Sequence, residues 1–161
     1  MDTLTTQPTL APARLLHYSA DRSVALPVHT TIELLDSPVI VDVPGAAHYC
    51  QQLVSWRGQW LALLDLEALL RARTDTPAAT LAVAPRYVLI VAYQCAPRSP
   101  VEYGAIGLPA LPQTVSVSDQ MACPLPADST LWPQLALSCF VHEERAVPIL
   151  DSARLFAGYI G

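Results

Sequence analysis

Proline limits this chain more than any other residue type. The 161 residues include 15 prolines, which divide the chain into short apolar segments. A proline inside a helix removes a backbone hydrogen bond and clashes with the preceding turn, so long helices are not expected. The segments between the prolines are often β-branched and end at turn residues, which is typical of many short strands. The sequence therefore predicts a mostly β fold with short helices.

The clearest hairpin pattern is formed by residues 53–57 and 60–64. Gly58 and Gln59 lie between these segments and suit a two-residue type II′ turn, because glycine takes the required positive φ without steric cost. Asp65 follows the second strand and precedes a short helical segment. We therefore predict that Asp65 is an N-cap, whose carboxylate accepts a backbone N–H of the first helical turn.

This turn would place Arg57 directly opposite Trp60 on one face of the hairpin, with Trp56 on the other face. Exposed tryptophan and arginine side chains are common anchors of protein interfaces. We therefore expect Trp60 beside Arg57 on a partner-facing side and Trp56 in the core. The alternative is that both tryptophans lie in the core.

A second hairpin resembles the first at a shift of 86 residues. The shift places Val54 over Phe140 and Asp65 over Asp151, and both hairpins precede a short helical segment. The similarity of the two hairpins predicts two related subdomains. Each would be too small to be very stable alone, so mutual burial of apolar surface is expected to join them.

The same patterns predict the domain organisation. Residues 1–13 are expected to form a flexible arm, and residues 14–161 a single domain. Its first subdomain would cover roughly residues 14–73 and its second roughly residues 86–161, with a linker rich in Thr, Ala and Pro at residues 74–85.

Composition indicates that this chain binds other proteins. Hydrophobic residues make up 52% of the chain and charged residues only 14%, whereas a typical soluble domain has about 25% charged residues. Part of the apolar surface is therefore expected to serve partners. The net charge of -5 argues against nucleic acid or an anionic membrane as the main partner. No apolar run is long enough to span a membrane, so direct membrane insertion is not expected.

Cysteine and histidine give no sign of a metal centre. None of the cysteines forms a Cys-x-x-Cys pair, and the histidines lack metal-ligand spacing, so no metal and no cofactor are predicted. The first interpretation of the cysteines is free, mostly buried thiols in a reducing compartment, and the second is two disulfides in an exported protein. The cysteines are Cys50, Cys95, Cys123 and Cys139.

Two other functions fit parts of the sequence. A hydrolase would use Asp65 and Asp151 as a carboxylate pair, although a helix cap explains each aspartate better. A small-ligand-binding β-barrel would need an enclosed apolar cavity. The chain has no Gly-rich phosphate loop and no Gly-x-Ser-x-Gly motif, so no catalytic residue is assigned.

Residues 54–66, Val-Ser-Trp-Arg-Gly-Gln-Trp-Leu-Ala-Leu-Leu-Asp-Leu, resemble the signature hairpin of the CheW family. Further segments that follow the family's order and spacing are residues 25–28, 33–35, 43–45 and 147–151. The resemblance covers roughly residues 14–157. The chain departs from the signature at Ser55-Trp56, where the family has Asn-Leu before the arginine.

The resemblance implies two SH3-like five-stranded β-barrels packed together, with no enzymatic activity. It also implies a cytoplasmic adaptor that couples a methyl-accepting chemoreceptor to a histidine kinase. One barrel would bind the regulatory domain of the kinase, and an apolar groove between the barrels would hold the helical receptor tip. Residues 103–109 are similar to accessory members from systems that control type IV pili. The output is therefore chemotaxis or twitching motility.

The resemblance also implies which residues contact partners. Glu33 and Arg57 match positions that form an ion pair in the family, and Thr31 falls in its receptor- or kinase-contacting region. Together with Trp60 from the hairpin argument, these residues form the predicted partner-binding site. The alternative is that the Glu33–Arg57 pair only ties the first hairpin to the preceding segment. The apolar neighbours of Glu33 are expected in the core.

Overall fold

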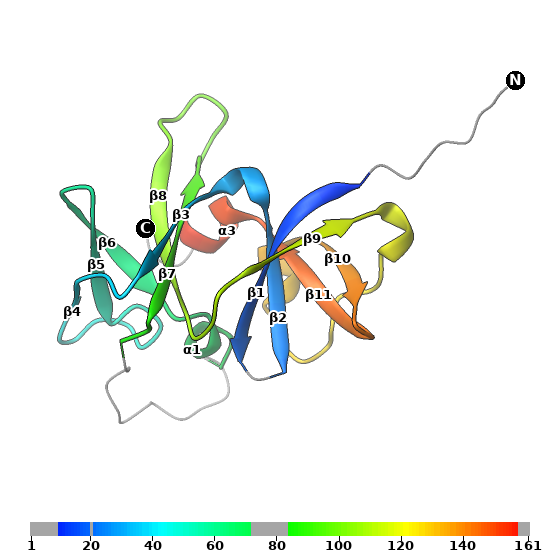
Figure 1. Cartoon of the computed structure of the whole chain (residues 1–161), viewed down its shortest axis with the longest axis horizontal. Helices are drawn as coiled ribbons and strands as arrows, with labels where there is room; N and C mark the ends of the chain where they lie inside the picture. The colour runs from blue at the N-terminus through cyan, green and yellow to red at the C-terminus, as the bar shows by residue number, and fades with distance from the viewer. Residues whose placement is uncertain (1–9, 20, 72–83, 158–161) are drawn as a thin grey trace, which may run out of the picture.

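The computed structural model describes residues 10–19, 21–71 and 84–157. Within these residues the chain forms two curled sheets with short helices beside them (Figure 1). The predicted arm at residues 1–13 lies mostly outside the described residues, but residues 11–13 belong to a strand. The predicted linker at residues 74–85 lies outside them except for its last two residues.

The five-stranded sheet has the strand order β10-β11-β2-β1-β9. Its strands are β1 (Ala11–Ser19), β2 (Arg22–Pro27), β9 (Gln113–Val117), β10 (Ala136–His142) and β11 (Arg145–Leu150). Strand β2 pairs in parallel with β11, and the other pairs are antiparallel. The last strands of the chain therefore complete a sheet that the first strands begin.

The six-stranded sheet has the strand order β3-β7-β8-β6-β5-β4. Its strands are β3 (Thr31–Asp36), β4 (Ile40–Asp42), β5 (Gln52–Trp56), β6 (Gln59–Leu64), β7 (Tyr87–Tyr93) and β8 (Glu102–Leu108). Strands β6 and β8 pair in parallel. In Figure 1 this sheet lies beside the five-stranded sheet, with α1 and α3 between them.

The prediction of a mostly β fold with two packed, barrel-like sheets is confirmed. The sheets differ, however, from the predicted halves at residues 14–73 and 86–161. Strands β1 and β2 come from the first half but join β9, β10 and β11, while β7 and β8 come from the second half but join β3 to β6. The similarity at a shift of 86 residues identified the related hairpins, but local sequence patterns do not determine which sheet each remaining strand joins.

Short helices follow the hairpins, as predicted. The helices are α1 (Leu66–Arg71), α2 (Trp132–Leu135) and α3 (Ser152–Ala157), with 3-10 turns η1 (Val28–Thr30) and η2 (Asp119–Met121). The amide of Ala68 donates to Asp65 Oδ1 at 3.1 Å, and the amide of Ala153 donates to Asp151 Oδ1 at 3.0 Å. Both aspartates therefore cap a helix, which confirms the predicted N-cap at Asp65.

Apolar side chains fill three places: the seam between the sheets and the concave side of each sheet. The seam combines Leu16 and Leu26 from the five-stranded sheet with Leu89 and Ile106 from the six-stranded sheet, and Trp132 of α2 packs into it. Each fully buried leucine contributes about 1.5–3 kcal/mol. A common apolar surface is therefore buried, as expected, although it lies between the two sheets and not between the predicted halves.

Close packing against α3 explains why position 104 on β8 is a glycine. A Cβ atom at this position would lie 2.4 Å from the ring of Phe156 on α3. The Phe156 ring also stacks on Tyr93 of β7, with ring centroids 5.3 Å apart. The glycine thus lets α3 approach the six-stranded sheet and close one side of the seam.

The first hairpin turns one residue earlier than predicted. Trp56 pairs with Gln59, so the turn residues are Arg57 and Gly58, with φ of 46° and 76°. Positive φ at both positions defines a type I′ turn, whose twist matches that of the flanking strands. The predicted type II′ turn at Gly58-Gln59 is therefore wrong, as is the predicted pairing of Arg57 with Trp60.

All four cysteines are free thiols, as the first interpretation holds. The expectation that they are mostly buried is wrong, because only Cys139 is buried. Cys50 and Cys123 are half-buried, and Cys95 is exposed. Three of these residues lie in or beside loops, where side chains reach solvent more easily than in the core.

Candidate partner-binding surface

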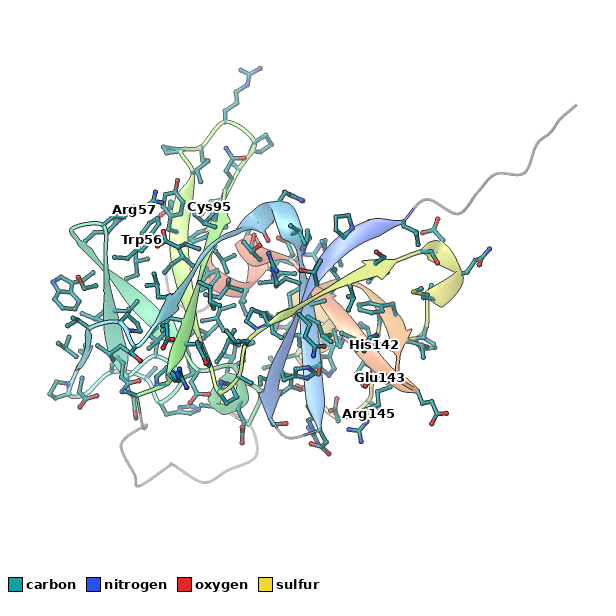
Figure 2. All side chains as sticks on the ribbon, in the orientation of Figure 1. Trp56, Arg57, Cys95, His142, Glu143 and Arg145 are labelled. Carbon is teal, nitrogen blue, oxygen red and sulfur yellow. The ribbon has the colours of Figure 1, made fainter. Side chains whose placement is uncertain are left out.

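Glu33, Trp56 and Arg57 form a small cluster where β3 approaches the β5–β6 turn. Glu33 Oε1 accepts hydrogen bonds from Trp56 Nε1 and from Arg57 Nη2, each at 3.2 Å. The Arg57 guanidinium lies 4.6 Å from the centre of the Trp56 ring, and Figure 2 shows the two side chains together at the turn. The ion pair that the resemblance implies for Glu33 and Arg57 is therefore present in the structure.

This cluster contributes little to the free energy of unfolding. The Glu33 and Arg57 side chains are both substantially exposed, and exposed ion pairs contribute about 0–1 kcal/mol. Stacking of an exposed arginine on an indole adds about 0.5–1 kcal/mol. The main physical effect of the cluster is to hold the Arg57 guanidinium in one place at the surface.

Trp56 and Trp60 lie on opposite faces of the hairpin. Trp56 is 5% exposed, which confirms its predicted place in the core, and its ring centre lies 5.0 Å from that of Tyr103. Trp60 is 52% exposed and pairs with Ser55. Because Trp60 follows Gln59, the partner of Trp56, its side chain points to the outer face. The structure therefore exposes Trp60 as expected but does not pair it with Arg57.

Trp60 belongs to an apolar strip on the outer face of β4, β5 and β6. Val41 pairs with Leu53, and Leu53 pairs with Ala62, so these residues form one row across the three strands. The next row includes Ser55 and Trp60, and the Ser55 amide donates to Val39 O at 3.0 Å. The outer strip, defined as Val39, Val41, Leu53 and Trp60, combines three exposed residues with the half-exposed Leu53.

The outer strip was only partly identified from the sequence. Val39 and Val41 lie in a short extended segment, and the alternation of their neighbours is the signal that could have found them. Ile32 and Leu34 on β3, expected in the core, are exposed instead. Strand β3 is an edge strand of the six-stranded sheet, so its outer face has no second layer to cover it.

Thr31 begins β3 and is half-buried. Its hydroxyl donates to the backbone oxygen of Val28 at 2.6 Å, which fixes the turn that leads into the strand. The structure therefore places Thr31 on the same strand as Glu33 but gives its hydroxyl a partner within the chain.

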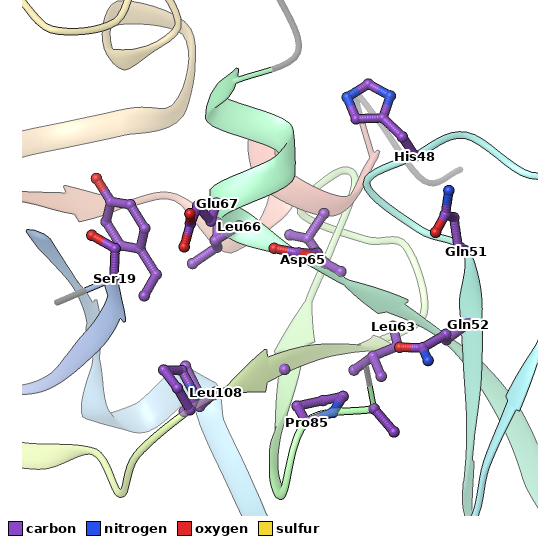
Figure 3. Close-up of a pocket in the computed structure, with 15 residues that line it drawn as sticks. Ser19, His48, Gln51, Gln52, Leu63, Asp65, Leu66, Glu67, Pro85 and Leu108 are labelled. Atoms are coloured by element: carbon purple, nitrogen blue, oxygen red, sulfur yellow. The ribbon is translucent and has the colours of Figure 1, made fainter. Parts of the chain in front are cut away.

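The described residues form a hollow beside α1 and another beside α3, both between the sheets. The α1 hollow, about 500 Å³ in volume, has Tyr18 among its lining residues. Figure 3 shows Leu63, Asp65 and Pro85 around it. The lining of the α1 hollow contains both polar and apolar side chains. Burial, with the Asp128 carboxylate as a smaller cause, raises the pKa of Tyr18 to about 12, so this phenol stays neutral at physiological pH.

The α3 hollow, about 400 Å³ in volume, lies between β2 and β10 on one side and β7 and its following loop on the other. Pro27, Tyr93, Val101 and Leu137 form the apolar part of its lining, beside polar residues that include Asp151. Leu137 is 56% exposed, so the apolar character continues onto the open rim. This hollow is a candidate for the predicted apolar groove between the barrels.

The two aspartates of the hydrolase hypothesis line different hollows. Asp65 lines the α1 hollow and Asp151 lines the α3 hollow. Each carboxylate caps its helix, and Asp151 also pairs with Arg154 at 3.4 Å. They do not form a carboxylate pair around one substrate, as glycosidases or aspartic proteases require.

The small-ligand hypothesis requires an enclosed apolar space inside a barrel. In the part of the chain that the structure describes, side chains pack the concave side of each sheet. The two hollows described above lie between the sheets instead. Among the same residues, no group of three or more His, Cys, Asp or Glu side chains is placed to hold a metal ion.

No helix among the described residues has the length and apolar character needed to cross a bilayer.

Comparison with known proteins gives a consistent result for the whole domain. The model of the CheW-like domain family matches residues 15–158. The crystal structure of the scaffolding protein TtCheW from Thermoanaerobacter tengcongensis superposes with a TM-score of 0.64 at 12% sequence identity, covering 89% of this chain and 90% of that chain. At this identity the structural match shows the fold alone. A comparison with curated proteins finds no match.

Proposed function

Because the chain belongs to the CheW-like domain family, we propose that it is a non-enzymatic adaptor in the cytoplasm that couples a chemoreceptor to a histidine kinase. The observation that carries this proposal is the apolar surface of the six-stranded sheet. The exposed Trp60 and its apolar neighbours have no cover within the described chain, and Glu33 holds Arg57 at the turn that ends the same hairpin. Such surfaces mark protein interfaces more often than small-molecule sites.

The regulatory domain of the kinase binds the outer strip in this proposal. Tryptophan is the residue type most enriched among interface residues that dominate binding, because it buries a large area with little loss of side-chain entropy. Trp60 therefore anchors the contact. Arg57 stays fixed by Glu33 and Trp56, so it loses little conformational freedom when a partner carboxylate approaches.

The receptor tip binds the α3 hollow. A helix with an apolar face fits an apolar groove, and Tyr93, Val101 and Leu137 supply one between the two sheets. The kinase and the receptor then occupy different surfaces, so one adaptor can hold both at once.

Binding of the kinase can be tested with its isolated regulatory domain, taken from the kinase gene nearest to this one. Trp60→Ala is expected to weaken the affinity about tenfold or more, and Arg57→Ala to weaken it less, measured by isothermal titration calorimetry. The matched control is Val141→Ala, which removes an exposed valine from the five-stranded sheet and should leave the affinity unchanged. Unchanged affinity in both the Trp60 and Arg57 variants would remove the site assignment.

Binding of the receptor can be tested by co-sedimentation with membranes that contain it. Leu137→Asp is expected to abolish co-sedimentation, because it replaces an exposed apolar side chain of the groove with a carboxylate that would be desolvated against the receptor helix. Leu111→Asp is the matched control, since Leu111 is about equally exposed but does not line the α3 hollow. Equal loss in both variants, or in neither, would contradict the assignment of the groove.

The motility output follows from the family subtype that residues 103–109 indicate. We expect deletion of the gene to reduce twitching zones while swimming zones stay normal. The reverse result would place the adaptor in flagellar chemotaxis instead.

A further inference from the structure

Cys123 and Cys139 face each other at the edge of the five-stranded sheet. Ala122 lies opposite Phe140 in an isolated antiparallel bridge, and the Cys123 amide donates to Cys139 O at 3.0 Å. The two Sγ atoms are 3.4 Å apart. Residues directly opposed on antiparallel segments have Cα atoms about 4.5–5.5 Å apart, which lies within the range of disulfides. The sulfurs can therefore reach bonding distance with small side-chain rotations.

The two thiols differ in their access to solvent. Cys139 is buried on β10, and this burial, with the Cys123 thiol beside it, raises the pKa of Cys139 to about 12. Cys123 is half-buried and lies in the segment after η2. A small oxidant in solution therefore reaches Cys123 first, while Cys139 remains a neutral thiol next to it.

We propose that Cys123 and Cys139 are a reversible oxidation site that forms an intramolecular disulfide when the protein meets a hydroperoxide. Cys123, as its thiolate, attacks the terminal peroxide oxygen; the O–O bond breaks, Cys123 becomes a sulfenic acid, and the released alkoxide or hydroxide takes up a proton. The Cys139 sulfur then displaces the hydroxyl group from Cys123, and the Cys139 proton leaves with that hydroxide as water. Two thiols and one hydrogen peroxide thus give one disulfide and two waters, and a dithiol reverses the reaction.

The disulfide would restrain a part of the chain that supports the seam. Residues 123–139 contain α2, and Trp132 and Leu135 of α2 are buried in the seam between the sheets. Cross-linking the ends of this segment lowers the entropy of the unfolded chain. We expect the oxidised protein to have a melting temperature about 5–10 °C above that of the reduced protein.

Cys50 and Cys95 provide internal controls, because they lie next to strands of the other sheet. Cys50 precedes β5, and its burial raises its pKa. Cys95 follows β7 and donates to a Glu102 carboxylate oxygen at 3.3 Å, which raises the pKa of its thiol. The thiolate is the form that reacts with peroxide, and a raised pKa leaves less of it at a given pH. We therefore expect Cys50 and Cys95 to be oxidised more slowly than Cys123 under mild conditions.

The test is thiol counting on the full chain after brief treatment with a small excess of hydrogen peroxide. The expected result is a fall from four free thiols to two, with mass spectrometry identifying a Cys123–Cys139 link in monomeric protein. The variant with Cys50→Ser and Cys95→Ser should still lose two thiols, and dithiothreitol should restore them. Disulfides between chains, links to Cys50 or Cys95, or sulfinic acid at Cys123 without a link would overturn the proposal.

Two further variants separate the roles of the sulfurs. Cys139→Ala should accumulate a sulfenic acid at Cys123 that dimedone traps, whereas the wild-type chain should not. Cys123→Ser should keep the Cys139 thiol intact under the same treatment. Cys139 is buried, so Cys139→Ala can impair folding, and the Cys123→Ser variant therefore serves as an independent test. Loss of the Cys139 thiol in the Cys123→Ser variant would show that oxidation of Cys139 does not depend on Cys123, which contradicts the proposal.

Discussion

The β5–β6 and β10–β11 hairpins have similar surroundings in the two sheets. In each hairpin the second strand also pairs in parallel with a strand from elsewhere in the chain. Each hairpin closes with two residues of positive φ: 46° and 76° at Arg57 and Gly58, and 49° and 67° at Glu143 and Glu144. The shift of 86 residues found in the sequence relates these turns residue by residue. Two different residue pairs therefore produce the same type I′ turn.

The two turns differ in charge and in how they are held. Arg57 is fixed by Glu33 and by the Trp56 ring. The Glu143 side chain is 82% exposed, and its Oε1 lies 3.8 Å from His142 Nε2, at the tip shown in Figure 2. The fold therefore constrains the backbone of the hairpin but not the chemistry at its tip. A fixed cation at one tip and exposed acids at the other give the two ends of the molecule different binding properties.

The largest expected effect tests whether the two hairpins contribute equally to the free energy of unfolding. Val54 and Phe140 occupy matching positions, and both are buried. Phe140→Ala should lower the free energy of unfolding by about 3–5 kcal/mol, and Val54→Ala by about 2 kcal/mol, because the larger ring leaves the larger cavity. Urea denaturation followed by circular dichroism measures both values. A greater loss in the Val54 variant would mean that the six-stranded sheet dominates stability.

A smaller effect is expected from exchanging the turn residues. Gly58→Ala places a Cβ in open space, so its cost arises from the positive φ alone, about 1 kcal/mol. Glu144→Gly relieves the same strain in the other turn and should stabilise the protein, by about 0.5 kcal/mol after the entropy cost of glycine. Thermal unfolding should show shifts of opposite sign. Shifts of the same sign would mean that side-chain contacts, not backbone conformation, determine the stability of these turns.

The smallest expected effect compares the charges at the two tips. Glu33→Gln removes the ion pair with Arg57 but keeps an oxygen that accepts the Trp56 N–H, so the stability should fall by less than about 1 kcal/mol. Glu143→Gln should change the stability even less, because the Glu143 side chain is 82% exposed and its Oε1 lies 3.8 Å from His142 Nε2. Unfolding at low and high salt concentration measures both. A salt-independent loss in the Glu33 variant would show that the hydrogen bond, not the charge, holds the cluster.

Several local features were predictable because they depend on neighbours in sequence. The aspartate that follows each hairpin caps the next helix through its own side chain. Trp56 lies two residues after Val54 on β5, on the same buried face, and is therefore buried. The turn at residues 57–58 was missed for a specific reason. Moving a two-residue turn by one position changes the pairing by two residues, so every side chain keeps its face and the hydrophobic pattern cannot distinguish the two registers.

The candidate site was predicted only in part. The resemblance placed Glu33 with Arg57, and the structure has them bonded. Trp60 was expected to be exposed, but its apolar neighbours Val39 and Val41 lie just before β4 and within it, and the bonds of this segment to β5 bring them to the same face. Exposure of Ile32 depends on β3 lying at a sheet edge, which is a property of the whole sheet.

The sequence alone determined the short strands, the two related hairpins and the helix caps, because these depend on prolines, alternation and side chains close in the chain. Only the tertiary structure decided that β1 and β2 join the last strands, and that Cys123 meets Cys139. Pairing between distant segments depends on how their apolar faces fit together once the whole chain is compact. That fit is a property of the assembled core and is not encoded in any single segment.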